Sequence, residues 1–147
     1  EDTVDKAIQV AQLPHQPSQS ADVHLYGYKP HPDLSNHMYV YGTEEEKILA
    51  LIKEDPTLGE KLHPQYDYTY AQVVWAVRHE MARTVEDFLA RRIRILFLDA
   101  EAAIAMAPQV ATLMAGELQQ DIHWKEEQLT AFGRLAERYT LRPQVEA

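Results

Sequence analysis

Apolar residues recur at helical spacing through much of the chain, and one stripe is especially regular. Its members stand at i, i+3, i+4, i+7 and i+11, and they are Tyr70, Val73, Val74, Val77 and Met81. Residues with this spacing share one face of an α-helix, which buries that face against a core. The pattern therefore predicts a helix that begins near Tyr70.

The segment that follows this stripe is predicted from its cap residues. Thr84 precedes Glu86 and Asp87, and a hydroxyl followed by carboxylates in the first turn is typical of a helix N-terminus. The apolar run from Ile93 to Leu98 is short and compatible with a strand, a 3₁₀-helix or an α-helix. Asp99 is expected to cap the helix after it.

Three signals divide the C-terminal third of the chain. A helix is predicted over residues 100–106. Pro108 is expected to kink that helix or to start another, because proline lacks the donor N–H that a helix interior needs; a new helix from about Pro108 to Gln119 is preferred. Asp121 is expected to cap the last helix. The side chains predicted to point inward from it are Leu129, Phe132, Leu135 and Tyr139.

The N-terminal third has weaker signals. Residues 3–13 carry apolar positions at helical spacing, with Thr3 as the expected N-cap. A polar linker broken by prolines follows over residues 14–20. The segment from His24 to Tyr28 is compatible with a short strand or an irregular docking segment. Residues 1–33 are therefore predicted to form an arm.

Two further helix starts lie between the arm and the regular stripe. Thr43 and Glu46 are spaced as a capping box, in which hydroxyl and carboxylate satisfy free backbone donors. Asp55 followed by Pro56 is typical of an N-cap and the first helical position. A short helix is therefore expected to run to about Leu62.

These elements predict an all-α fold, an irregular bundle of about six short helices with an extended N-terminal arm. The 147 residues suit one domain with a real core. The expected division is an arm and linker over 1–33, a helical C-terminal domain over 34–142 and a tail over 143–147.

Composition removes several classes of function. The formal net charge of −9 disfavours nucleic acid as a partner. The chain has no cysteine, which excludes disulfides, thiolate nucleophiles and cysteine-based metal sites. No apolar run approaches the roughly 20 residues that span a bilayer. The start at Glu1, without Met, suggests an excised fragment or a mature C-terminal piece.

No residues are predicted to be catalytic, cofactor-binding or metal-binding. The glycine-rich phosphate motifs are absent, because every glycine is isolated; these are Gly27, Gly42, Gly59, Gly116 and Gly133. His79 and Glu80 point to different helix faces. His123 can converge with Glu126 and Glu127, but no third ligand is evident. The remaining serines and histidines are expected in loops or at the surface; they are Ser18, Ser20, Ser35, His15, His24, His31, His37 and His63.

Five arginines form a basic strip in this acidic chain, and two interpretations stay open. They are Arg78, Arg83, Arg91, Arg92 and Arg94. The strip is either a site for phosphate or anionic lipid or a set of internal ion pairs. Ion pairing is favoured because Asp87 lies four residues before Arg91, and Arg92 or Arg94 is expected to pair with Asp99 or Glu101.

Aromatic residues cluster just before and within the regular stripe. Tyr66, Tyr68, Tyr70 and Trp75 suggest a stacking surface for single-stranded nucleic acid or packing in a core or between domains. The negative net charge favours packing.

The order of residues resembles one known family, that of the C-terminal domain of FAD-dependent glycerol-3-phosphate dehydrogenases and alpha-glycerophosphate oxidases. The resemblance covers nearly the whole chain and is strongest over residues 66–132. The segments that carry it are Glu1–Asp5, Tyr41–Thr43, Val73–Glu80, Ala82–Leu89, Arg91–Arg94, Phe97–Ala100, Pro108–Val110 and Met114–Leu118.

The resemblance implies a non-catalytic helical domain that follows a large FAD-binding domain. In the family, the parent oxidises sn-glycerol 3-phosphate to dihydroxyacetone phosphate, and electrons pass from FAD to quinone or oxygen. The implied partners are the FAD-binding domain of the same polypeptide and a second copy in a homo-oligomer. The sequence contains no EF-hand loop, so we expect a bacterial, cytoplasmic parent that contacts the inner membrane only peripherally. The alternative is a stand-alone module that binds an anionic partner through Arg83–Arg94.

Overall fold

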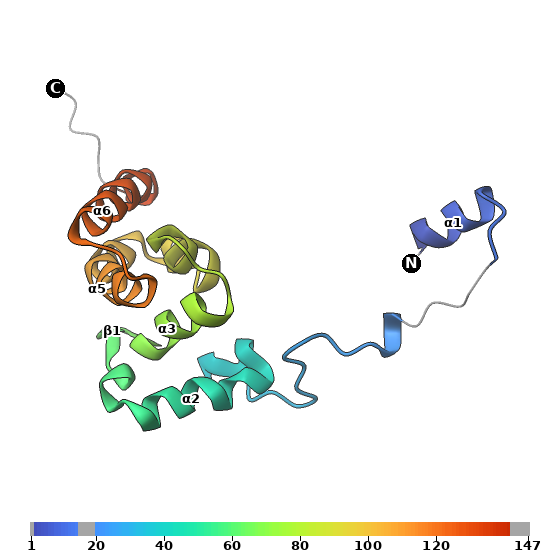
Figure 1. Ribbon diagram of the computed structural model, residues 1–147, viewed down its shortest axis with the longest axis horizontal. Helices are drawn as coiled ribbons and strands as arrows, with labels where there is room; N and C mark the ends of the chain where they lie inside the picture. Colours follow the sequence, from blue (N-terminus) through green and yellow to red (C-terminus); the bar gives the residue numbers. More distant parts are fainter. Residues whose placement is uncertain (1, 15–19, 142–147) are drawn as a thin grey trace. The chain divides into compact units, whose positions relative to one another are not determined.

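The computed structural model describes residues 2–14 and 20–141, and these are mostly helical with one small hairpin (Figure 1). The predicted all-α class is confirmed. Contacts divide the chain into two compact units, residues 1–44 and 45–147. The division predicted from the sequence differs by assigning residues 34–44 to the helical domain. Residues 15–19 of the linker predicted over 14–20, and the predicted tail over 143–147, lie outside the described residues.

The first unit contains three short helical elements, which are α1 (Asp2–Val10), η1 (Ser20–Asp22) and η2 (His37–Glu44). The helix predicted near the N-terminus is confirmed, but Thr3 lies inside it and does not cap it. None of the residues of α1 is buried. The segment from His24 to Tyr28 forms no strand; its backbone turns, and the N–H of Tyr28 donates to the carbonyl of Leu25 at 3.0 Å.

Two glycines hold the loop of the first unit against η2. Gly27 and Gly42 have φ angles of +83° and +54°, a region that glycine adopts without steric cost. A Cβ on Gly42 would lie 1.7 Å from the carbonyl oxygen of Gly27. The N–H of Thr43 donates to that same oxygen at 3.0 Å. Only glycine therefore fits at position 42.

The second unit begins with α2 (Glu45–Glu54) and η3 (Pro56–Gly59). The start of α2 lies two residues after the predicted cap Thr43, which belongs to η2 instead. Asp55 caps η3 as predicted, since its Oδ1 accepts from the N–H of Thr57 at 3.0 Å. The short helix ends at Gly59 and not near Leu62, because the next residues enter a strand.

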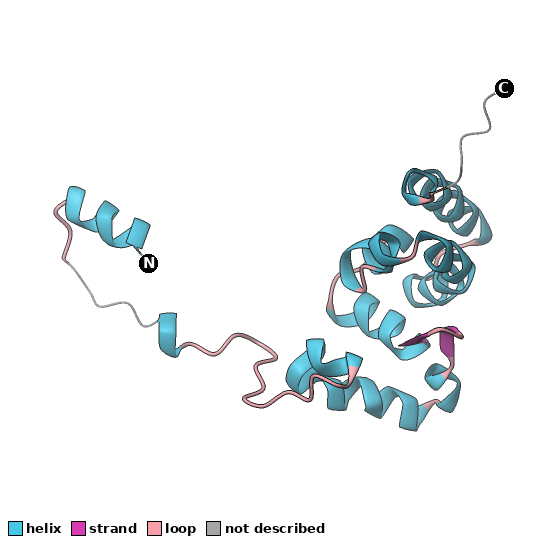
Figure 2. Cartoon of the chain, turned by 180° about the vertical axis from the view of Figure 1, so that it is seen from behind, coloured by secondary structure: helices cyan, strands magenta, loops and turns pink. Residues whose placement is uncertain are grey.

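A hairpin that the helical pattern did not predict joins η3 to α3. Strand β1 (Lys61–His63) pairs antiparallel with β2 (Tyr66–Thr69), and the register is irregular between Lys61 and His63. The hairpin is the magenta element in Figure 2. The ammonium group of Lys61 lies 2.6 Å from Oδ1 of Asp67, and β1 packs on α5.

The predicted helix near Tyr70 is confirmed as α3 (Tyr70–His79), but Met81, the last member of the predicted stripe, lies beyond its end and is 79% exposed. It starts at a capping box: the side-chain oxygen of Gln72 accepts from the backbone N–H of Thr69 at 2.8 Å. Seven consecutive residues from Ala71 to Val77 are buried. This helix is therefore surrounded by protein and not only packed along one stripe.

Five further helical elements follow along the described part of the second unit. They are the π-helix η4 (Asp87–Arg92), α4 (Ile95–Leu98), α5 (Ala100–Leu118), α6 (Ile122–Ala136) and η5 (Glu137–Tyr139). Two predicted caps are confirmed. Asp99 accepts from the N–H of Ala102 at 2.9 Å, and Asp121 accepts from the N–H of Trp124 at 3.0 Å.

The predicted break at Pro108 is wrong. Pro108 lies inside the single helix α5, where it leaves one backbone carbonyl without its helical donor. Buried residues before and after the proline compensate for the lost hydrogen bond, because Met106, Ala107 and Val110 pack into the core. The ring of Pro108 itself faces solvent.

The core of the second unit lies where α3, η4, α5 and α6 meet. α5 packs against α3 on one side and α6 on the other (Figure 1). The largest side chains at the centre include Phe88, Leu89, Met106 and Met114. Phe132 is buried, and Leu129 and Leu135 pack against the core as predicted. Tyr139 was predicted to point inward, but it is 46% exposed because it lies beyond the end of α6 in η5.

Candidate functional site

The arginine-rich segment between α3 and α5 has the most unusual backbone of the second unit. Met81 and Arg94 both have positive φ, at 60° and 59°. Between them the chain forms a π-helix over Asp87–Arg92. π-Helical turns are rare and often occur at functional sites, and left-handed residues other than glycine are uncommon. This segment is therefore the candidate site.

The cap predicted at Thr84 is confirmed and is reciprocal. The hydroxyl of Thr84 accepts from the N–H of Asp87 at 3.1 Å, and the carboxylate of Asp87 accepts from the N–H of Thr84 at 2.9 Å. That carboxylate also accepts from the N–H of Arg83 at 3.0 Å. Burial alone would raise the pKa of Asp87, but these hydrogen bonds and the charge of Arg91 lower it overall.

The predicted pair of Arg91 with Asp87 is confirmed. The guanidinium of Arg91 contacts the carboxylate of Asp87 and also lies 2.7 Å from that of Glu86. The guanidinium of Arg83 donates to the carbonyls of Val77 and Ala82 at 3.1 and 3.3 Å. Both arginines are therefore engaged within the segment.

Arg78 links two helices through a pair that the sequence did not predict. Its Nε and Nη2 lie 2.6 and 2.7 Å from the two carboxylate oxygens of Glu117 on α5. Such a bidentate pair fixes orientation as well as distance. It joins the C-terminal turn of α3 to the last turn of α5.

The partner predicted for Arg92 is wrong. Arg92 donates to the backbone carbonyl of Glu80, and its Nε lies 3.6 Å from the Glu80 carboxylate. It therefore turns back toward the end of α3 and away from Asp99 and Glu101. Arg94 makes no ion pair with any residue in the described ranges, so its predicted pairing with Asp99 or Glu101 is also wrong.

A cavity of about 320 Å³ lies beside these groups. It is lined by Glu80, Met81, Ala82, Asp87, Arg91 and Arg92. Burial raises the pKa of the Glu80 carboxyl, although the charges of Arg92 and His79 oppose the shift. The cavity thus combines two guanidinium groups, two carboxyl groups and one thioether.

The tyrosine cluster serves packing, as favoured from the sequence. Tyr66, Tyr68 and Tyr70 pack partly buried against the core, and Trp75 is only 4% exposed. The hydroxyl of Tyr66 donates to Asp99 at 3.0 Å, and that of Tyr68 donates to the carbonyl of Ile93 at 3.4 Å. The hairpin is therefore fastened to the start of α5 and to the end of η4.

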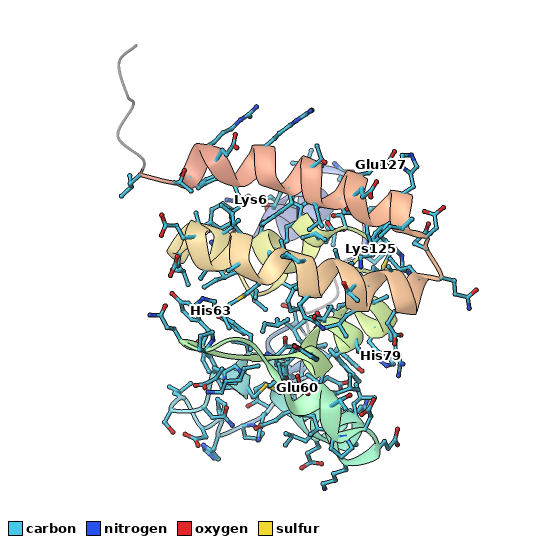
Figure 3. All side chains as sticks on the ribbon, turned by 90° about the vertical axis from the view of Figure 1, so that its left-hand side faces the viewer. Lys6, Glu60, His63, His79, Lys125 and Glu127 are labelled. Carbon is cyan, nitrogen blue, oxygen red and sulfur yellow. The ribbon has the colours of Figure 1, made fainter. Side chains whose placement is uncertain are left out.

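The histidines and serines considered from the sequence that the structure describes lie on several different elements. His63 lies at the hairpin, and His79 lies at the other end of α3 (Figure 3). The ring of His79 is tilted by 31° to that of Trp75, with the ring centroids 4.0 Å apart. Ser35 donates to Asp33 at 2.6 Å, and His24 stacks on Tyr28 at 4.1 Å. Ser20 lies in η1 and His37 in η2, and His31 lies in a bend of the backbone. His15 and Ser18 lie outside the described residues.

Two of the three possible metal ligands on α6 contact each other. Nε2 of His123 lies 3.3 Å from the carboxylate of Glu127, one helical turn further on; Glu127 is labelled in Figure 3. Within residues 2–14 and 20–141, no three His, Asp or Glu side chains are grouped to hold a metal ion. Over the same ranges, no helix is long and apolar enough to cross a membrane.

The glycines do not form a cradle for a dinucleotide phosphate. Gly27 and Gly42 contact each other, so the space that their missing side chains leave is filled by backbone. Gly116 and Gly133 lie inside α5 and α6, and a Cβ on either would meet nothing within 4 Å. None of these four glycines therefore has the arrangement of a glycine-rich phosphate loop.

Sequence reasoning missed the hairpin and the cavity. The hairpin had a local signal, because Tyr66, Tyr68 and Tyr70 alternate with polar residues after the turn at Pro64–Gln65. The cavity had no local signal in the sequence, because it depends on how the π-helix η4 packs against the end of α3.

Comparison with known proteins gives a consistent result. A family model described as the C-terminal domain of alpha-glycerophosphate oxidase matches residues 14–129. The mitochondrial glycerol-3-phosphate dehydrogenase of Macaca fascicularis is 32% identical over 152 residues, which cover 88% of this chain and 20% of that protein. The human mitochondrial glycerol-3-phosphate dehydrogenase is 30% identical over 152 residues, which again cover 88% of this chain and 20% of that protein.

A plant relative gives a shorter match. The mitochondrial glycerol-3-phosphate dehydrogenase SDP6 of Arabidopsis thaliana is 32% identical over 91 residues, which cover 62% of this chain and 14% of that protein. The chain thus spans about a fifth or less of the length of these relatives. No solved structure matches it significantly. The predicted family resemblance is confirmed, and the expectation of a bacterial parent stays a prediction.

Proposed function

The chain belongs to the family of C-terminal domains of alpha-glycerophosphate oxidase and glycerol-3-phosphate dehydrogenase, and we propose that it is the non-catalytic helical domain of such an enzyme. The parent would oxidise sn-glycerol 3-phosphate to dihydroxyacetone phosphate, pass hydride to FAD and hand the electrons to quinone. The family match over residues 14–129 carries this proposal.

The layout of the chain supports a structural role. Four of the five arginines in the basic strip are bound by carboxylates or carbonyls of the same unit. The glycines form no phosphate cradle. We infer that the flavin and substrate are bound by another part of the polypeptide, which would be the main partner of this domain.

Further partners and the location are part of the same proposal. A homo-oligomer would place a second copy beside this one, and contact with the inner membrane of a cytoplasmic enzyme would be peripheral. Nucleic acid is not proposed as a partner, because the net charge of −9 opposes binding to a polyanion.

Flavin content tests the proposal directly. The purified 147-residue chain should show no flavin absorption and no reduction of a dye by sn-glycerol 3-phosphate, while circular dichroism shows it folded. The protein translated from the full coding sequence should show both signals. Stoichiometric flavin in the folded 147-residue chain would contradict the proposal.

The alternative is a module that binds an anionic partner through Arg83–Arg94. The observation in its favour is Arg94, which is exposed and makes no ion pair with the described residues. The pairing of Arg91 and the carbonyl contacts of Arg83 and Arg92 oppose it. Binding to anionic vesicles at low salt that is lost in Arg94→Ala, and kept in the exposed control Arg134→Ala, would support this alternative.

A further inference from the structure

Met81 occupies a backbone position that ordinarily suits glycine. It follows Glu80, the C-cap of α3, and has a φ of 60°. The N–H of the next residue, Ala82, donates back to the carbonyl of Ala76 at 3.0 Å, so the left-handed residue closes the helix end. A side chain with a Cβ is strained there.

The strain at Met81 is not offset by packing. Its side chain is 79% exposed, so it buries little apolar surface. Backbone outliers of this kind often mark functional positions. Burial of apolar surface therefore does not explain a methionine at this position, and the reactivity of its thioether is the property that distinguishes it.

Met81 also differs from the other three methionines of the chain in its exposure to solvent. Met38 is 6% exposed, and Met106 and Met114 are fully buried. An oxidant dissolved in water therefore reaches one methionine sulfur in the folded protein far more easily than the others. Oxidation to the sulfoxide turns a weak acceptor into a polar group with a strongly accepting oxygen.

The cavity beside Met81 supplies donors for such an oxygen. Arg91 and Arg92 line the same cavity of about 320 Å³. Each guanidinium has five N–H donors, and the bonds to Asp87, Glu86 and Glu80 use only part of them. A sulfoxide oxygen at Met81 would share this cavity with two cationic donors.

We propose that Met81 is an oxidation site whose sulfoxide is held by Arg91 and Arg92. A hydroperoxide is the oxidant: the sulfur lone pair attacks one peroxide oxygen, an S–O bond forms and the O–O bond breaks. The departing oxygen takes the proton and leaves as water or an alcohol. The sulfur loses two electrons, and the peroxide gains them.

The test is oxidation of the folded 147-residue chain with dilute hydrogen peroxide, followed by peptide mass spectrometry. Met81 should oxidise roughly tenfold faster than Met38, Met106 and Met114, because exposure governs access. In denaturant the four rates should converge. Equal rates in the folded protein would overturn the proposal.

Stereochemistry separates a built site from a merely exposed methionine. Oxidation of a free side chain gives two sulfoxide epimers in about equal amounts, whereas arginine N–H groups that bind the oxygen while it is being transferred should bias the ratio to about three to one or more. The ratio is read from sensitivity to the two epimer-specific sulfoxide reductases. Arg91→Gln and Arg92→Gln should each reduce the bias, and Arg134→Gln on α6 should keep it. An equal ratio in the unsubstituted protein would reject the role of the arginines.

Discussion

The hydroxyl of Tyr66 in strand β2 donates to Oδ2 of Asp99, the N-cap of α5, at 3.0 Å. The same carboxylate accepts from the N–H of Ala102 through Oδ1. The side chain that starts the longest helix thus also fastens the hairpin. The hydrogen bond from Ala102, followed by that from Tyr66, lowers the pKa of Asp99, and the bond to Asp99 raises the pKa of Tyr66.

Removing this hydroxyl should loosen the hairpin. We expect Tyr66→Phe to lower the free energy of unfolding by about 1 kcal/mol, the usual net value of one hydrogen bond. Urea denaturation measures the change. Tyr139→Phe is the matched control, since Tyr139 is 46% exposed and contacts Phe97 through its ring. Equal effects of the two substitutions would contradict the role of the Tyr66 bond.

Acid should destabilise the protein partly through Asp87. Its folded pKa lies below the ordinary value of 3.8, so its contribution is present above the unfolded pKa and is lost as pH falls through the folded pKa. Asp87→Asn should therefore flatten the dependence of unfolding free energy on pH below about pH 4. Circular dichroism with urea at several pH values measures the slope.

Thr84→Val provides an intermediate case for the same titration. It removes the Thr84 hydroxyl, whose side-chain hydrogen bond lowers the pKa of Asp87, while leaving the Asp87 carboxyl in place. The slope of Thr84→Val should lie between those of the unsubstituted chain and Asp87→Asn. A slope in Asp87→Asn as steep as in the unsubstituted chain would show that Asp87 does not contribute.

Two glycine substitutions should have opposite effects. Gly42→Ala places a Cβ 1.7 Å from the carbonyl oxygen of Gly27 at a φ of +54°, so the contact between the loop and η2 should open. Gly133→Ala lies in α6 with nothing within 4 Å of the new Cβ, and should stabilise by about 0.5–1 kcal/mol. Hydrogen exchange at the Thr43 amide should accelerate in Gly42→Ala alone. Protection of that amide in both variants would contradict the prediction.

Restoring the missing donor in α5 should stabilise the second unit. Pro108→Ala adds the N–H that a helix interior normally provides, and proline costs about 3 kcal/mol there relative to alanine. The greater freedom of the unfolded chain offsets part of this gain. We expect a net stabilisation of about 1 kcal/mol, measured as a higher urea midpoint with an unchanged m-value. A lower midpoint would show that the helix is adapted to the proline ring.

Several elements were predictable because their signals are local. Asp99 and Asp121 cap helices as expected, since the side-chain oxygen bonds an amide only three residues away. The pair of Asp87 and Arg91 also needs only one helical turn. Such interactions depend on spacing along the chain, and spacing can be read directly.

Other features depended on distant residues and were missed. Arg78 finds Glu117 at a separation of 39 residues, and Arg92 turns back to Glu80 across the π-helix. Pro108 stays within α5 because buried neighbours hold the helix together on both sides. None of these outcomes follows from local preference, because each is decided by packing between elements.

The sequence by itself determined the helical class, the main caps and the family, since these depend on local spacing and on the order of residues. Only the tertiary structure decided which carboxylate each arginine meets, that Met81 stands exposed in a left-handed conformation, and that a cavity forms beside it. The physical reason is that burial and ion pairing join residues far apart in the chain, and their partners are chosen when α3, η4 and α5 pack together.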